Sequence, residues 1–230
     1  MLNRVLAIAA LVAASIPGVA CAHHGLDFLV VQTAHLPQQG TGYAIGRVDY
    51  LAEDEDEMEF EPAMLYGARD WMAFELHAHI EKPEGDSAHY ESLAPALSFR
   101  LTPRGNKFSF GVSVEYEIAS DSDAEDVAGV TGIFGYEAAG WIATANLQYE
   151  KPTNESGELG FAIGARRALS AGHGIGVEVF GSLENNGPSE VLLGYYGELS
   201  QRFSINAGIG TGLDDGPDLA VRSAFIWRFR

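Results

Sequence analysis

Cysteine is almost absent from this sequence, and long apolar runs are equally scarce. Cys21 is the single cysteine among 230 residues, and it lies close to the N-terminus, so a disulfide framework is excluded. Beyond residue 22, no segment approaches the roughly 20 consecutive apolar residues that a membrane-spanning helix needs. If the chain enters a membrane, it must therefore do so without helices.

Positive charge is also in short supply. Lys and Arg number 14 against 32 Asp and Glu, which gives a net charge of -18. A nucleic-acid partner would require basic patches, so that class of partner is excluded. The hydrophobic content of 47% argues against disorder, and the length suits one domain or two small ones.

Residues 1–22 have the pattern of a secretory signal peptide. A basic start at Arg4 is followed by an apolar run and then by the small residues Ala20-Cys21-Ala22. This small-x-small pattern predicts export and cleavage after Ala22. Two alternatives remain. One is an uncleaved anchor, for which the apolar run is short, and the other is lipidation of Cys21, which the preceding residues support poorly.

Apolar and polar residues alternate in segment after segment from residue 41 onward. Between residues 140 and 150, every second residue from Trp141 to Tyr149 is apolar, and the residues between them are mostly polar. This period is typical of a strand whose two faces meet different surroundings. Each segment has about the length of a tilted membrane strand. The twelve expected strands are 41–52, 56–67, 71–81, 90–102, 107–118, 127–138, 141–151, 158–168, 174–184, 189–199, 202–212 and 218–229.

The composition of the two faces favours lipid outside and water inside. The apolar faces end in Trp and Tyr, as the interface girdles of membrane barrels do. The polar faces are rich in Gly, Ser, Ala, Asn, Glu and Arg but contain almost no Lys. The outer face of a soluble barrel would instead be rich in Lys, Thr and Glu. A soluble periplasmic barrel that binds a ligand is the alternative.

Long and short connections alternate between the expected strands. "KPEGDSAH" is a long connection and "SAGH" is a short one. Outer-membrane barrels have long extracellular loops and short periplasmic turns. The long connections carry most of the acidic residues and the short ones carry arginine, so one end is acidic and the other basic. The sequence thus predicts an all-β fold, an antiparallel up-and-down transmembrane β-barrel of about 12 strands.

On these features the chain resembles a Gram-negative outer-membrane β-barrel protein, most of all the small porin-like or transporter-like barrels. The resemblance covers residues 41–230 and includes the closing "AFIWRFR", in which the aromatic Phe229 is penultimate and not last. It implies an outer-membrane location, contact with lipid and lipopolysaccharide, and handling by periplasmic chaperones and the barrel-assembly machinery. Residues 23–40 are expected to form a segment or plug at the periplasmic mouth, and an extra strand or a short helix is the alternative.

Charged residues on the predicted inner face are the first candidates for function. A ring of such charges could select solutes, or it could fill a narrow barrel as a ladder of ion pairs. The two roles are compatible, and both fit a passive channel for a small solute with an acidic extracellular mouth. The set comprises Arg47, Arg100, Arg166, Arg222, Arg228, Glu59, Glu75 and Glu115.

Two histidine pairs are candidates for metal binding. His77 and His79 share the predicted inner face, so they could bind one metal ion. The alternative is a pair of hydrogen-bonded lumen histidines, because two ligands are few for a defined site. His23 and His24 could chelate copper or nickel through a terminal amine, or simply belong to a terminal tail. No cofactor is predicted.

A catalytic set is not evident. Barrel phospholipases and lipid A deacylases use Ser, His and Asn or Asp near the lipid-facing rim. This sequence has no Ser-Asn-Gly stretch and no convincing pairing of His with Ser. We therefore predict that the protein is not an enzyme. The alternatives to a channel are a plugged structural or surface-binding barrel and a membrane-embedded hydrolase.

Overall fold

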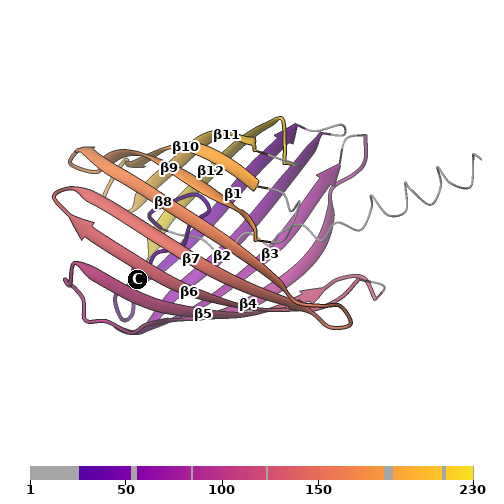
Figure 1. Ribbon diagram of the computed structural model, residues 1–230, viewed down its shortest axis with the longest axis horizontal. Helices are drawn as coiled ribbons and strands as arrows, with labels where there is room; N and C mark the ends of the chain where they lie inside the picture. Colours follow the sequence, from indigo (N-terminus) through magenta and orange to yellow (C-terminus); the bar gives the residue numbers. More distant parts are fainter. Residues whose placement is uncertain are drawn as a thin grey trace, which may run out of the picture.

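Twelve strands form one closed barrel in the computed structural model of the protein (Figure 1). The structure describes residues 26–52, 56–83, 85–122, 124–183, 189–213 and 216–229. All twelve predicted strands are confirmed. Their bounds are β1 (Gly42–Ala52), β2 (Glu57–Arg69), β3 (Met72–Pro83), β4 (His89–Arg100), β5 (Phe108–Ala119), β6 (Val127–Ala138), β7 (Trp141–Pro152), β8 (Glu158–Ser170), β9 (His173–Ser182), β10 (Ser189–Glu198), β11 (Phe203–Gly212) and β12 (Leu219–Phe229).

Each strand pairs antiparallel with its neighbours in sequence, and β1 pairs with β12 to close the sheet. The closing pair runs without interruption from Gly42 opposite Phe229 to Ala52 opposite Leu219. Closure leaves no open edge, so backbone N–H and C=O groups of the wall are satisfied within the sheet. The predicted up-and-down topology is therefore confirmed. In the part of the chain that the structure describes, no helix is long and apolar enough to cross a membrane.

The two ends of the barrel differ in the length of their connections. At the short-turn end, the link between β6 and β7 is Ala139-Gly140, with φ of 52° and 80°. Successive positive φ values of this kind give a tight hairpin whose twist matches that of the strands. The longer connections meet at the opposite, long-loop end, except that residues 101–107 between β4 and β5 form a long link at the short-turn end. Because the strand number is even, β1 begins and β12 finishes at the short-turn end.

Large apolar side chains cover the outer surface of the barrel. Phe134, Leu147 and Ile163 are about half exposed, although they lie in the middle of their strands. Phe110 and Phe134 meet edge to face across neighbouring strands, with ring centroids 5.5 Å apart. A soluble protein does not expose a continuous apolar belt of this kind to water. The belt contradicts the alternative of a soluble barrel and fits a protein embedded in the outer membrane.

Aromatic residues with a polar edge mark both margins of the belt. Such residues prefer the membrane–water interface, so they fix the depth of the barrel in the bilayer. Every tryptophan of the chain is at the short-turn margin. The short-turn margin contains Trp71, Trp141, Trp227, Tyr66, Tyr136 and Tyr195, and the long-loop margin contains Tyr90, Tyr116 and Tyr149.

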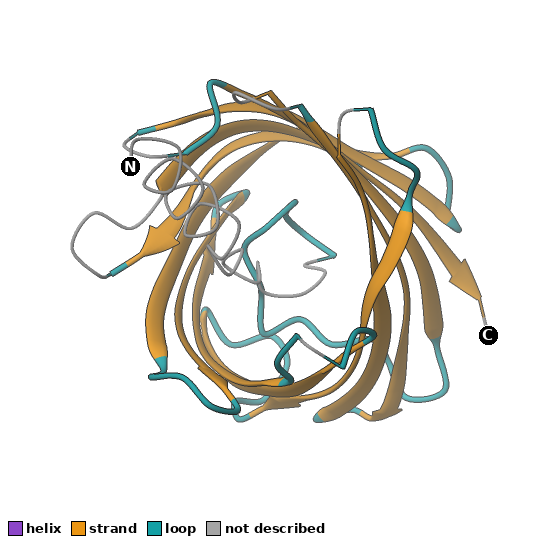
Figure 2. Cartoon of the chain, turned by 90° about the vertical axis from the view of Figure 1, so that its right-hand side faces the viewer, coloured by secondary structure: helices purple, strands orange, loops and turns teal. Residues whose placement is uncertain are grey.

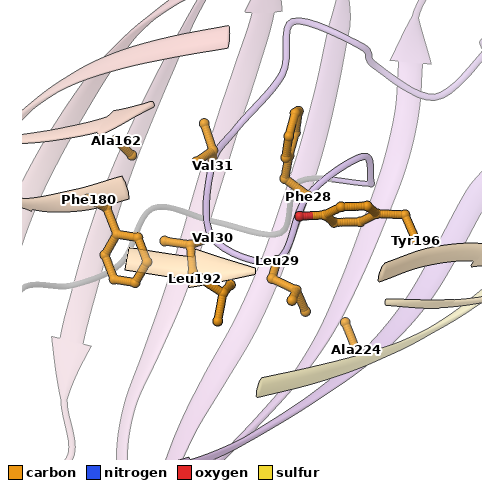
Figure 3. Packing of buried hydrophobic residues seen from close by; sticks show 9 residues of the cluster. All are labelled: Phe28, Leu29, Val30, Val31, Ala162, Phe180, Leu192, Tyr196 and Ala224. Atoms are coloured by element: carbon orange, nitrogen blue, oxygen red, sulfur yellow. The ribbon is translucent and has the colours of Figure 1, made fainter. Parts of the chain in front are cut away.

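Residues 26–41, called the inner segment below, run inside the barrel and not along its rim. Figure 2 shows this loop within the ring of strands. Residues 28–31 are no more than 2% exposed, although they belong to no strand. The inner segment gives the lumen a small apolar core (Figure 3). That core consists of Phe28, Leu29, Val30, Val31, Ala162, Phe180, Leu192, Tyr196 and Ala224.

Glycines of the barrel wall make room for this core. A Cβ atom on Gly164 of β8 would lie 2.9 Å from the ring of Phe28. A Cβ atom on Gly208 of β11 would lie 2.7 Å from Cδ1 of Leu29. A Cβ atom on Gly164 would force the ring of Phe28 to move, and one on Gly208 would displace the end of the Leu29 side chain, so glycine at both positions permits the close approach.

A second apolar cluster lies where the inner segment passes into β1. Leu36 packs there against Ile45, Leu65 and Ile226 on the lumen face of the wall. The backbone N–H of Gly40 donates to the carbonyl of Gly67 at 2.8 Å. The inner segment is thus anchored at its C-terminal end before the first strand begins.

Candidate functional site

Glu178, in the middle of β9, holds the inner segment by its backbone. Its Oε1 accepts a hydrogen bond from the N–H of Leu29 at 2.9 Å, and its Oε2 accepts from Val30 and Val31 at 2.8 Å each. The hydroxyl of Tyr196 donates to Oε1 at 2.7 Å. Glu178 is 0% exposed, so four donors replace the water that its carboxylate would otherwise need.

The next residue of the inner segment is bound by β7. The N–H of Gln32 donates to Oδ1 of Asn146 at 2.7 Å, and its carbonyl accepts from Nδ2 of Asn146 at 3.0 Å. The hydroxyl of Thr144 donates to the same carbonyl at 2.9 Å. Four successive N–H groups, from residue 29 to residue 32, therefore bond to just two lumen side chains.

An ionic cluster fixes the inner segment at the short-turn end. Asp27 lies 2.5 Å from Arg166 of β8 and 2.5 Å from Nδ1 of His35. It also accepts a hydrogen bond from the hydroxyl of Thr33 at 3.0 Å. Nε2 of His35 contacts the carboxylate of Glu137 on β6. Asp27 and His35, bound to each other, thus link the inner segment to two strands of the wall, β8 and β6.

Asp27 and His35 stabilise each other's charged forms. Burial alone would raise the pKa of Asp27, but the bond to His35 and the charges of His35 and Arg166 lower that pKa to about 2. Burial alone would lower the pKa of His35, but Asp27 and Glu137 raise it above its usual 6.5. Both effects favour the ion pair near neutral pH.

We expect the contact between His35 and its carboxylates to weaken as the pH rises. A raised pKa makes the contribution of His35 fully present below pH 6.5, and deprotonation removes it as the pH passes the raised value. The lowered pKa of Asp27 acts at the other extreme, with a loss only as the pH falls from 3.8 towards 2. An NMR titration of the His35 ring, assigned with His35→Gln, should give a pKa above 6.5.

The same pair of proteins checks the effect on stability. In urea unfolding, the stability advantage of the wild type over His35→Gln should shrink as the pH is raised above neutrality. A ring that titrates at or below 6.5, together with a stability difference that does not change with pH, would contradict this expectation.

Arg47 and Arg222 meet one carboxylate in the half of the lumen nearer the long-loop end. Asp49 accepts from Nη2 of Arg47 at 2.5 Å, and it also contacts Arg222. Arg47 lies 3.3 Å from Glu61, and Arg222 lies 2.7 Å from Glu190. All five residues are buried, and they join β1, β2, β10 and β12. The network spans one side of the lumen with alternating charges, which stabilises buried ions that would each be costly alone.

Arg100 binds backbone carbonyls, one of which belongs to the inner segment. Its guanidinium donates to the carbonyls of Thr102 at 2.9 Å and Ala34 at 3.2 Å. Arg104, in the turn after β4, donates to the carbonyls of Leu36 and Pro37 at 3.0 and 2.9 Å. Two arginines therefore clamp the backbone of the inner segment near the short-turn end.

The other predicted lumen residues lie at different heights. Arg228 is near the end of β12, at the short-turn end. Glu59 lies opposite Asp49 in one neighbouring strand and opposite Glu81 in the other. Together with Arg166 beside Asp27, these positions spread the predicted set along the barrel axis.

Glu75 and Glu115 flank a buried histidine. Nδ1 of His77 is 3.9 Å from Glu75, and Nε2 of His77 is 3.6 Å from Glu115. His79 shares the lumen face with His77, and the two rings are 5.1 Å apart.

The predicted signal peptide 1–22, His23 and His24 lie outside the described residues.

Two cavities flank the inner segment at the short-turn end. The larger, of about 610 Å³, is lined by His35, Arg100, Arg104 and Lys107, among others. The smaller, of about 190 Å³, lies beside Asp27, Arg166 and Tyr196. The lumen is thus narrowed at this end by the inner segment but not completely filled.

Several of the residues that hold the site were not among the predicted ones. Asp49, Asn146 and Tyr196 are examples, and none belongs to a motif that marks it in the sequence. One sign was available, because apolar Leu192 and Tyr196 interrupt the lumen face of β10. An apolar lumen face needs an apolar partner, and the run at residues 28–31 could have supplied it.

The closed barrel, its apolar exterior and its polar lumen define the class: this is an outer-membrane β-barrel protein of porin-like architecture. No known protein family and no curated protein matches the chain. Solved structures do resemble it. An outer-membrane channel from Pseudomonas putida F1 has a TM-score of 0.70 and 9% identity, over 85% of this chain and 97% of that chain.

Two further solved structures share the architecture. The KdgM porin matches with a TM-score of 0.61 and 8% identity, over 82% of this chain and 99% of that chain. The CymD monoaromatic hydrocarbon channel matches with a TM-score of 0.55 and 9% identity, over 84% of this chain and 90% of that chain. At such low identity, the likeness establishes a common fold.

Proposed function

We propose that this protein is a passive channel for a small solute across the outer membrane. The observation that carries the proposal is the charged lining of the barrel's lumen, where a buried network of charged side chains crosses one side of the wall. Charged lumen walls discriminate between solutes that pass close to them. The shared fold with proteins described as channels and porins supports the same function.

The charges at the two ends support a preference for cations. The long-loop end, which would face the cell exterior, carries most of the acidic residues, and a mouth of one sign concentrates solutes of the opposite sign. A similar structure is described in complex with an oligogalacturonate and another as a monoaromatic hydrocarbon channel. For this chain, the acidic mouth disfavours polyanions such as the former. The acidic residues in and beside the long connections include Glu57, Glu81, Asp86, Asp121, Glu125, Glu150, Glu155 and Asp218.

The inner segment gives the second candidate function its support. Because residues 26–41 fill part of the lumen, the barrel could instead be a permanently plugged structural or surface-binding protein. The two candidates differ in one respect, which is whether solute can pass when the inner segment is loosened.

Single-channel conductance of the purified, refolded protein tests this choice. Wild-type protein and a variant with a weakened inner segment are compared in planar bilayers, first in KCl and then in salts of large organic ions. We expect discrete conductance steps that favour cations. The steps should be larger in the variant whose inner segment is weakened. Barrels that are silent in both forms, yet folded and heat-modifiable on gels, would refute a channel and favour the plugged barrel.

A further inference from the structure

We infer that Glu61, His77 and His79 form a binding site for one divalent transition-metal ion inside the lumen. Each of the three residues offers a ligand atom, and these atoms all lie within 4.8 Å of one another. The inference goes beyond the proposed transport function and does not depend on it, because a metal could bind whether or not solute passes.

The sheet brings the three residues together by its register. Residues two apart on a strand share a face, so His77 and His79 of β3 both point into the lumen. Ala63 of β2 lies opposite His77, which places Glu61, two residues earlier in β2, beside His79. The pairing of β3 with β4 shifts directly after His79. Such β-bulges re-aim side chains and are frequent beside functional sites.

The distances are close to those of a metal site. Nε2 of His77 and Nε2 of His79 each lie 4.0 Å from the same atom, Oε1 of Glu61. In a tetrahedral zinc site, ligand atoms about 2.1 Å from the metal stand roughly 3.4 Å apart. Small rotations of three side chains would therefore be enough to close the site around an ion.

The surroundings of His77 are those of a metal ligand. While Nε2 faces Glu61, Nδ1 faces the carboxylate of Glu75 at 3.9 Å. Metal-binding histidines commonly direct the second ring nitrogen to a carboxylate, which fixes the tautomer and the ring orientation. Glu115 places a further carboxylate 3.6 Å from Nε2 of His77.

Charge also favours a cation at this position. Three carboxylates, of Glu61, Glu75 and Glu115, lie within 4.0 Å of His77. Arg47 approaches Glu61 through the other oxygen, Oε2, and so leaves Oε1 directed at the histidines. Two imidazoles with a carboxylate suit Zn²⁺, Ni²⁺ or Cu²⁺ better than Ca²⁺ or Mg²⁺, which prefer oxygen ligands.

A second group at the long-loop end provides a matched comparison. Glu81, His89 and Glu91 also offer ligand atoms within 4.8 Å of one another. This group has a single imidazole, and the side chain of His89 is 53% exposed, against 0% for His77 and 25% for His79. Mobile exposed carboxylates seldom define one stoichiometric site, so we assign the metal to the lumen group.

Calorimetric titration of the full-length, refolded protein in detergent with ZnCl₂ tests the site. We expect one ion per barrel in the wild type. His79→Ala should weaken binding by more than about tenfold, because even outer-shell partners such as Glu75 contribute roughly 10-fold to 100-fold to metal affinity. His89→Ala, the matched control, should leave the affinity unchanged. Heat-modifiability on gels verifies that each variant is folded.

The outcomes are decisive in both directions. Unchanged binding in a folded His79→Ala variant, or a loss confined to His89→Ala, would overturn the assignment. Should His79→Ala fail to fold, electron paramagnetic resonance of Cu²⁺ replaces it, measured on a variant with His23→Ala and His24→Ala so that these two histidines cannot bind the ion. The spectrum should show coupling to two imidazole nitrogens, and a spectrum with oxygen ligands alone would overturn the site as well.

Discussion

Replacing Glu178 with Gln is expected to release the inner segment and increase the conductance of the barrel. The carboxylate accepts hydrogen bonds from Leu29, Val30, Val31 and Tyr196. Gln offers a single oxygen and turns an NH₂ donor towards backbone N–H groups. Each lost bond to a charged acceptor costs about 1.5–3 kcal/mol. The free energy that favours the bound position of residues 28–31 over a displaced position should therefore be largely lost.

Planar-bilayer recordings of a graded set of variants measure this effect. Tyr196→Phe removes one of the four donors and should raise the conductance less than Glu178→Gln does. Gly164→Ala displaces the ring of Phe28 by steric overlap, so it should act in the same direction by a different route. Gly129→Ala is the control, because a Cβ atom there meets nothing closer than 3.8 Å.

Equal conductance in the wild type, Glu178→Gln and Gly164→Ala would contradict the role given to the inner segment. Its docking would then have no influence on the path through the barrel. Increased conductance in Gly129→Ala as well would attribute the effect to a general loosening of the wall. Either result would show that the packing of the inner segment does not control the conductance of the lumen.

Leu147→Arg is expected to have the largest effect on insertion into the membrane. Leu147 lies at the centre of β7, and its side chain is 50% exposed on the outer belt. An arginine on the lipid face at the bilayer midplane costs about 2–4 kcal/mol in a transmembrane barrel. The variant should fold into vesicles with a lower yield and unfold at a lower urea concentration than the wild type.

Leu159→Arg is the matched control for this experiment. Leu159 is 44% exposed on the same belt but lies at the long-loop end of β8, close to the interface. Arginine near the interface costs about 0–1 kcal/mol, so this variant should behave almost as the wild type does. Equal recovery of folded Leu147→Arg and Leu159→Arg barrels would show that Leu147 does not face the middle of the bilayer.

The strands could be predicted from the sequence because their signal is local. Side chains alternate between the two faces of a strand, so the polarity of every second residue indicates which medium that face meets. Leu147 therefore appears on the outer face and Asn146 on the inner one, as predicted. The alternation of long and short connections likewise fixes which strand ends lie together, whatever the details of packing.

The pairing of charges could not be predicted in the same way. Arg47 and Arg222 were assigned to the lumen, but which carboxylate each arginine meets depends on register and on side-chain reach across strands. Arg100 and Arg166 contact the inner segment, because a backbone carbonyl of that segment lies within reach of Arg100 and Asp27 lies within reach of Arg166. Only the three-dimensional structure shows that Arg222 contacts Asp49, a residue 173 positions away.

The sequence by itself determined a twelve-stranded barrel with an apolar outside and a polar inside. These properties follow from periodicity and composition, which act residue by residue. The tertiary structure decided that residues 26–41 lie in the lumen, that Glu178 binds their backbone and that Glu61 joins His77 and His79. The physical reason is that backbone donors carry no sequence signature, and that closure of the sheet alone sets which inner faces meet.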